Sequence, residues 1–189
     1  IGAAGRRSEQ FDYADLLSRH TTVEQLAEIA NTDTSRIARL WAYRILLKKA
    51  DNQVIDVLKQ ALKDTTHVEL ESGCSGFEEP YYRAALSVYR YDGYELKLPN
   101  QLCFSLDSLV FFDYMKPCGF ERGLLMDFKP HKIYYATVIE EADKGNDAIL
   151  PLLAQYKNPN DRQRINKLLK ANLKKAGACS YEACGAIGN

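Results

Sequence analysis

The chain has 189 residues, of which 46% are hydrophobic and 26% are charged, enough apolar material for a folded domain with its own core. This composition excludes an intrinsically disordered chain, and no apolar run approaches the roughly 18 residues that a membrane-spanning helix needs. The net charge is zero, but acidic side chains are in excess in the middle of the chain and basic ones near its end. This asymmetry bears on the choice of partner rather than on the fold. The chain begins at Ile1 instead of Met, and we expect a processed or excised product.

Residues 1–66 are predicted to form a helical region. Apolar residues recur every three or four positions in four short segments, as amphipathic helices require. The segments are Phe11–Arg19, Thr22–Ala30, a helix that runs through Lys49, and one that contains Val54–Leu62. Thr34 or Ser35 is suited to capping the third helix, and Asp51 or Asn52 the fourth, because short polar side chains accept hydrogen bonds from free backbone amides.

Residues 67–140 are predicted to form a mostly antiparallel sheet rich in tyrosine. The strongest local pattern is a hairpin in which Ser87–Tyr91 and Tyr94–Leu98 flank Asp92-Gly93, a pair that favours the positive φ angles of a type I′ turn. Further strands are expected at Gln101–Leu106, Leu109–Tyr114, Leu124–Phe128 and Lys132–Ile139. The connections are too short for helical crossovers, which predicts antiparallel pairing.

Residues 141–189 are predicted to return to helix. One helix is expected at Asp147–Gln155, and a second after Asn158, which is suited to capping it, with Pro159 at the first helical position. The sequence therefore predicts an α+β fold with a helical N-terminal third, a mostly antiparallel tyrosine-rich sheet and C-terminal helices, assembled into one compact domain.

One stretch of the helical region carries a recognisable motif. In residues 21–42, TTVEQLAEIANTDTSRIARLWA, apolar positions around Ala27 are followed by a short turn at Asn31 and a second apolar helix. This stretch resembles a helix-turn-helix. The resemblance implies that four side chains face DNA: Thr34, Ser35, Arg36 and Arg39. The same residues also fit a helical hairpin that packs only on its neighbours, because the basic side chains are spread around the second helix.

A second basic element is the C-terminal helix, where residues 157–175 contain a single acid. Its cations are opposed by an apolar stripe that can dock on the rest of the domain. The basic side chains proposed to bind are Arg162, Arg164, Lys167, Lys170, Lys174 and Lys175. They suit nucleic-acid phosphate or an acidic protein surface, and an ordinary solvated helix face is the alternative. A membrane is not expected as partner, because the apolar stripe has no aromatic anchors.

Weak signals for catalysis lie in a glycine-rich turn that contains Cys74 and Ser75, with His67 or His131 as a possible base. No cofactor or metal site is expected, because the spacing of the cysteines does not match that of structural zinc sites. Five cysteines without framework spacing favour free thiols in the cytoplasm or another reducing compartment.

Binding is therefore favoured over catalysis. The leading hypothesis is a non-enzymatic, nucleic-acid-associated or regulatory protein that uses the helix-turn-helix-like segment and the basic C-terminal helix. The alternative is a protein–protein interaction module or complex subunit that does not contact nucleic acid. A small Cys/His hydrolase or secreted effector is the third hypothesis.

Overall fold

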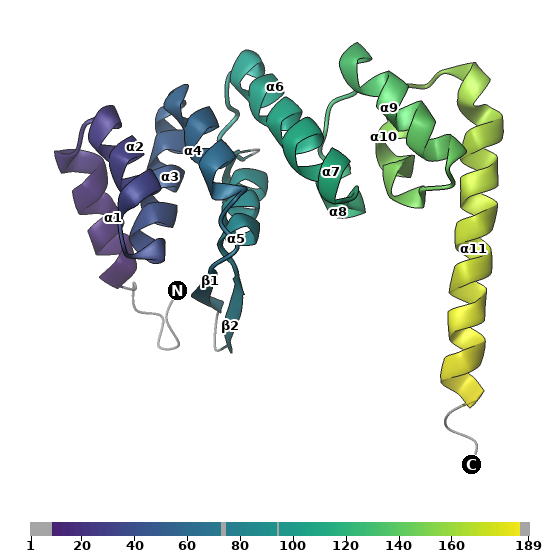
Figure 1. The fold of residues 1–189 in the computed structure, drawn as a ribbon, viewed down its shortest axis with the longest axis horizontal. Helices are drawn as coiled ribbons and strands as arrows, with labels where there is room; N and C mark the ends of the chain where they lie inside the picture. Colours follow the sequence, from purple (N-terminus) through teal and green to yellow (C-terminus); the bar gives the residue numbers. More distant parts are fainter. Residues whose placement is uncertain (1–8, 73–74, 94, 186–189) are drawn as a thin grey trace. The chain divides into compact units, whose positions relative to one another are not determined.

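The structure is a computed structural model that describes residues 9–72, 75–93 and 95–185. Side chains are described within 10–70, 76–93 and 95–173. The chain divides into two compact units, Ile1–Tyr114 (unit 1) and Met115–Asn189 (unit 2). Figure 1 shows the elements of both units in chain order. The boundary between the units lies inside the region that the sequence predicts as sheet.

Unit 1 begins with four helices, which confirms the prediction for the N-terminal third. They are α1 (Glu9–His20), α2 (Val23–Thr32), α3 (Arg36–Lys49) and α4 (Gln53–Ala61). A capping box between Thr22 and Gln25 begins α2, and the hydroxyl of Ser35 begins α3 by accepting a hydrogen bond from the Ala38 amide. At α4 the carboxylate of Asp51 accepts from the Gln53 amide. Local capping chemistry therefore determines where these helices start.

Helix α3 is the centre of unit 1. It packs against α1, α2, α4 and the later helix α5 (Tyr81–Val88), and half of its side chains are buried. At the α1 contact, Phe11 and Trp41 meet edge to face with ring centroids 5.3 Å apart. The buried residues of α3 are Ala38, Leu40, Ala42, Tyr43, Ile45, Leu46 and Leu47. A helix with this pattern is a core element rather than a surface helix.

The strands of the described part form one antiparallel pair, β1 (His67–Ser72) and β2 (Ser75–Pro80). In the register of this pair Glu69 lies opposite Glu78, and Leu70 opposite Phe77. The fold is thus mostly helical with a small antiparallel sheet, and that sheet lies before the segments predicted as strands.

The predicted tyrosine-rich sheet is wrong for unit 1. The segment predicted as a hairpin begins with the last two residues of α5 and continues into a π-helical turn at Tyr89–Gly93. The strands predicted at Gln101–Leu106 and Leu109–Tyr114 are helical as well, because Asn100–Leu109 forms α6, which is followed by a second π-helical turn at Val110–Met115. Gly93 is needed for close packing and not for a turn. Its φ lies outside the left-handed region, and a Cβ there would lie 3.0 Å from the ring of Tyr89.

All regular elements in the described part of unit 2 are helical. Its elements are α7 (Lys116–Cys118), α8 (Arg122–Leu125), α9 (Lys132–Asp143), a 3-10 turn at Asp147–Ile149, α10 (Leu150–Gln155), a 3-10 turn at Pro159–Asp161 and α11 (Arg162–Gly185). The predicted C-terminal helices are confirmed. The predicted Asn158 cap is confirmed as well, because the side chain of Asn158 accepts a hydrogen bond from the Asn160 amide.

The strands predicted at Leu124–Phe128 and Lys132–Ile139 are wrong, because these segments contribute to α8 and α9. In α9 the buried side chains of Tyr134, Val138 and Ala142 recur every four residues and face the core of unit 2 as one helical stripe. No helix in the described ranges combines the length and the apolar character that a membrane crossing requires.

Candidate nucleic-acid interface

The side chains predicted to face DNA at the start of α3 fall into two groups. Thr34, Ser35 and Arg36 are exposed and close together in the chain. Ser35 caps the helix, and the guanidinium Nε of Arg36 donates to the hydroxyl of Thr66 at 2.7 Å. These three residues form a small polar surface at the N-terminal end of α3.

Arg39, in contrast, is part of the interior of unit 1. Its Nε donates to the carbonyl of Ala30 at 3.0 Å, and its Nη1 lies 2.7 Å from Oδ2 of Asp64. The guanidinium also lies over the ring of Tyr81, 4.1 Å from the centroid, and only 14% of the side chain is exposed. Arg39 therefore connects the end of α2, the segment after α4 and the start of α5.

The electrostatics of this cluster match its geometry. Partial burial opposes ionisation of Asp64, but hydrogen bonds from Thr66 and Arg39 outweigh it and lower the pKa of the carboxyl. Burial raises the pKa of Tyr81 to about 12, so its hydroxyl stays protonated beneath the guanidinium. The cluster is a charge-paired structural contact within unit 1.

The exposure of α3 limits what it can offer to a groove. Its exposed positions are at its two ends, Arg36 at the start and Lys48 and Lys49 at the finish. A recognition helix needs a free face along its first turns in order to enter the major groove. In the first turns of α3 only Arg36 is exposed, so the helix does not present such a face.

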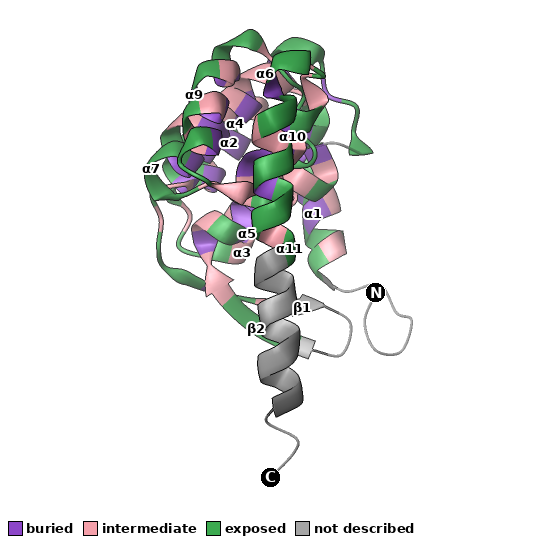
Figure 2. Cartoon of the chain, turned by 90° about the vertical axis from the view of Figure 1, so that its right-hand side faces the viewer, coloured by how far each residue is buried: buried purple, intermediate pink, exposed green. Residues whose placement is uncertain are grey.

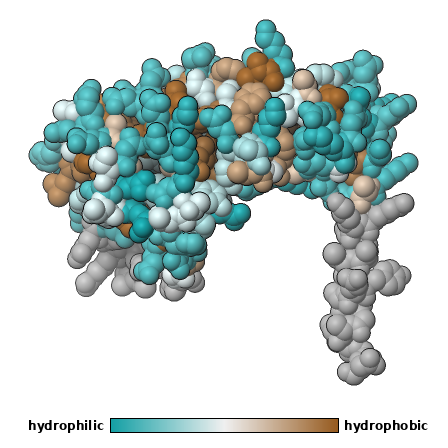
Figure 3. All heavy atoms as spheres, viewed as in Figure 1, coloured by the Kyte–Doolittle hydropathy of each residue, from teal (hydrophilic) through white to brown (hydrophobic). Residues whose placement is uncertain are grey.

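Helix α11 presents a longer polar surface. Four exposed side chains lie within about 100° of one another around the helix axis, because consecutive residues turn by about 100°. They are Gln163, Asn166, Lys167 and Lys170, with the exposed Arg162 at their edge. We call these five residues the α11 basic face; much of the first part of α11 is exposed in Figure 2 and hydrophilic in Figure 3.

Positive charge dominates the α11 basic face, and Asp143 compensates part of it, because the charge of Lys167 helps to lower the pKa of that carboxyl. From Arg162 to Leu173 the helix has no acidic residue. None of the three cations of this face, Arg162, Lys167 and Lys170, forms an ion pair with a residue of the described part. The opposite side of the helix carries Leu168, which is 2% exposed and packs into unit 2. The side chains of Lys174 and Lys175, also predicted to bind, lie outside the described residues.

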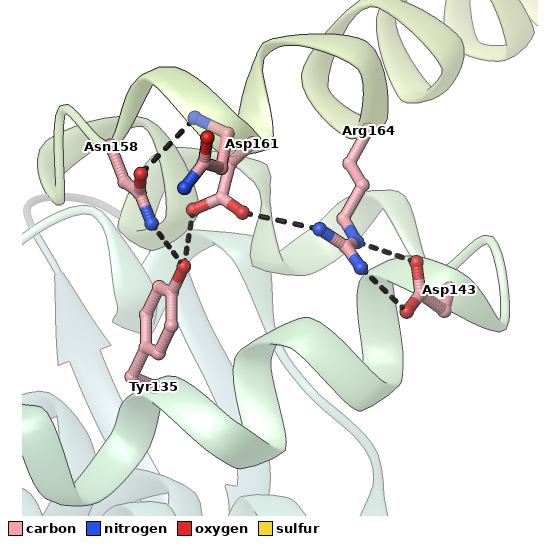
Figure 4. Close-up of polar contacts among 6 residues, drawn as sticks. Tyr135, Asp143, Asn158, Asp161 and Arg164 are labelled. Atoms are coloured by element: carbon pink, nitrogen blue, oxygen red, sulfur yellow. Dashed lines mark hydrogen bonds and ion pairs between the residues drawn. The ribbon is translucent and has the colours of Figure 1, made fainter.

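Arg164 differs from these cations because it anchors α11 to α9 (Figure 4). Its Nε and Nη2 bind the two carboxylate oxygens of Asp143 at 2.7 and 3.3 Å, and its Nη1 lies 3.4 Å from Oδ1 of Asp161. Asp161 is 1% exposed, and its other oxygen accepts from the hydroxyl of Tyr135 at 2.8 Å. The amide of Asn158 donates to the same hydroxyl at 2.5 Å.

The charges in this anchor stabilise one another. Hydrogen bonding to Arg164 lowers the pKa of Asp143, and the bond that Tyr135 donates to Asp161 raises the pKa of the phenol. The buried carboxylate thus keeps a donor on each oxygen, as a buried charge requires. The anchor positions the first turn of α11 against the end of α9.

The predicted catalytic side chains lie only in part within the described residues. His67 is exposed at the start of β1 in unit 1, whereas His131 belongs to unit 2 and accepts from the Ile133 amide as the cap of α9. Cys74 and the side chain of Ser75 lie outside the described residues. A group of three or more His, Cys, Asp or Glu side chains placed for a metal is absent from the part of the chain that the structure describes.

The sequence interpretation missed two features of this site. Gln163 and Asn166 belong to the basic face, and their positions four residues before Lys167 and Lys170 could have identified them. The partnership of Arg164 with Asp143 had no such signal, because 21 residues separate them. No protein-family model, curated protein or solved structure matches the chain.

Proposed function

We propose that the protein binds nucleic acid through the phosphate backbone, using the α11 basic face. The observation that carries this proposal is a helix face on which cations and side-chain amides are exposed together without any acid. Lysine and arginine neutralise phosphates and release counterions, and amide side chains donate hydrogen bonds to phosphate oxygens. Contacts of this kind hold the duplex or single strand without reading base edges.

The proposed interface gives a definite salt dependence. Three described cations, Arg162, Lys167 and Lys170, correspond to a slope of about −2.7 in a plot of log K against log salt for duplex DNA. Affinity would then fall about fortyfold between about 50 and 200 mM salt. The polar surface formed by Thr34–Arg36 on α3 is a second, smaller phosphate contact in the same proposal. Arg39 has no part in it, because its guanidinium is used within unit 1.

Fluorescence anisotropy with a labelled duplex and a labelled single strand tests the proposal. We expect Lys167→Glu combined with Lys170→Glu to weaken binding at least about tenfold at about 50 mM salt. The matched control is Lys48→Glu combined with Lys59→Glu, which makes the same change of net charge at exposed positions of unit 1. Equal losses in the two double variants, or no binding by the unaltered protein, contradict the proposal.

A second function, binding of an acidic protein surface, is favoured by one observation on the same helix. Leu169 and Leu173 are 43% and 72% exposed and lie one turn apart, and Lys170 lies three residues before Leu173 on the helix surface. Exposed leucines beside cations suit an acidic amphipathic helix. Replacing both leucines with serine distinguishes the two functions, since it would abolish capture of a protein partner and leave nucleic-acid affinity unchanged.

A further inference from the structure

A hollow of about 540 Å³ lies beside the β1–β2 pair, and all of its described lining belongs to unit 1. Its walls come from α1, α3 and the two strands. The lining residues are Gln10, Ile37, Glu69, Leu70, Gly76, Phe77 and Glu78. This volume falls within the range of sites that accept a ligand or the side chains of a bound peptide.

The apolar part of the hollow is open to solvent. Leu70 and Phe77 are direct partners in the strand register and therefore lie on the same face of the sheet, and Ile37 on α3 is half-buried near them. Phe77 is 47% exposed, and a Cβ added at the neighbouring Gly76 would meet no atom within 4 Å. A further apolar side chain would remove exposed surface of Phe77 from water and gain hydrophobic free energy.

An unfavourable charge pair accompanies this apolar surface. Glu69 and Glu78 are both exposed and lie directly opposite each other across the two strands, an arrangement in which like charges destabilise a sheet. Within the described ranges neither carboxylate forms an ion pair. Because successive side chains alternate between the two faces of a strand pair, these two negative charges lie on the other face from Leu70 and Phe77.

We propose that this hollow binds an extended, basic segment of a partner protein. An apolar side chain of that segment packs against Leu70 and Phe77. The lysine or arginine side chains next to it in the segment point to the other face of the sheet, as neighbours in an extended chain do, and pair there with Glu69 and Glu78. The β1–β2 sheet has two strands, so each strand also has an edge without a strand partner in the described part, where an extended backbone can add hydrogen bonds. The carboxylates exclude nucleic acid as the occupant by repulsion of phosphate.

The experiment measures binding of a fluorescein-labelled peptide, in which a leucine is flanked by arginines, to the whole chain. The control ligand is the same peptide with glutamate in place of each arginine. We expect the basic peptide to bind and the acidic one not to bind. Glu78→Lys is expected to weaken binding about tenfold or more, because it removes one partner of the peptide cations and repels the rest. Glu28→Lys, an exposed charge reversal on α2, is the matched control and should bind normally.

The apolar contact is tested separately by Phe77→Ala, against Tyr91→Ala as a control at a residue that is 65% exposed. Loss of peptide binding in Phe77→Ala alone supports the proposal. Equal effects of Glu78→Lys and Glu28→Lys, or equal effects of the two alanine variants, overturn it. Self-association that Glu78→Lys abolishes, with no peptide binding, also overturns it and makes a second copy of the chain the occupant.

Discussion

Replacing Arg39 with alanine tests whether this residue holds unit 1 together. The substitution removes the ion pair with Asp64, in which the two side chains are 14% and 18% exposed, and leaves a largely buried carboxylate without its cation. It also removes the donor to the Ala30 carbonyl and the contact with the ring of Tyr81. Asp64 keeps its hydrogen bonds from Thr66, which limits the loss. We expect a decrease of about 3 kcal/mol in the free energy of unfolding.

Urea denaturation followed by circular dichroism measures this loss as a lower midpoint with an unchanged slope for the transition of unit 1. Arg36→Ala is the matched control, because Arg36 is exposed and makes one side-chain hydrogen bond, so its removal should cost no more than about 0.5 kcal/mol. Equal midpoints for the two variants would refute this account of Arg39. Loss of nucleic-acid binding by Arg39→Ala at unchanged stability would refute it as well.

Three further predictions concern stability. Because the pKa of Asp64 is lowered in the folded state, its ionised form stabilises the fold fully above about pH 3.9, and this stabilisation is lost as the pH falls through the folded-state pKa. The melting temperature of Asp64→Asn should therefore depend less on pH in the acid range than that of the unaltered protein. Glu78→Lys should raise the free energy of unfolding by about 0.5 kcal/mol in urea titrations, since it converts the repulsion with Glu69 into an attraction; a lower midpoint would contradict this. Tyr135→Phe should lower the free energy of unfolding by about 1 kcal/mol, because buried Asp161 loses a donor, and an unchanged midpoint would show that the bond contributes nothing.

The parts of the fold that follow local rules were predictable from the sequence. Ser35 and Asn158 act as helix caps in the structure as their positions indicate, and the helices that follow them were expected. The same local reasoning failed at Asp92-Gly93. There the glycine is required by the close approach of the Tyr89 ring, a contact within a helix that turn chemistry does not reveal.

The tyrosine-rich middle was misassigned for a related reason. Aromatic residues favour strands on average, but the burial of Tyr81, Ala84, Ala85 and Tyr89 follows a helical period set by packing within unit 1. The strands that do form contain several glutamates, which are rare in strands, so their sequence gave little indication of a sheet.

The candidate site was predictable in part. A basic stripe on the last helix was visible in the sequence as a run of cations without acids. The sequence could not separate the cations that remain exposed from those used within the fold, because Arg39 and Arg164 find their carboxylates 25 and 21 residues away in the chain. Which arginines are exposed is decided by tertiary packing alone.

The most direct test of the proposed function is the salt dependence of duplex binding by the unaltered protein and by a variant with Lys167→Gln and Lys170→Gln. Neutral glutamines preserve the polarity and helix propensity of the face while removing two phosphate contacts. The account predicts that the slope of log K against log salt becomes shallower by about 1.8 in the variant. An unchanged slope would contradict it, because the α11 basic face would then not be where phosphate is neutralised.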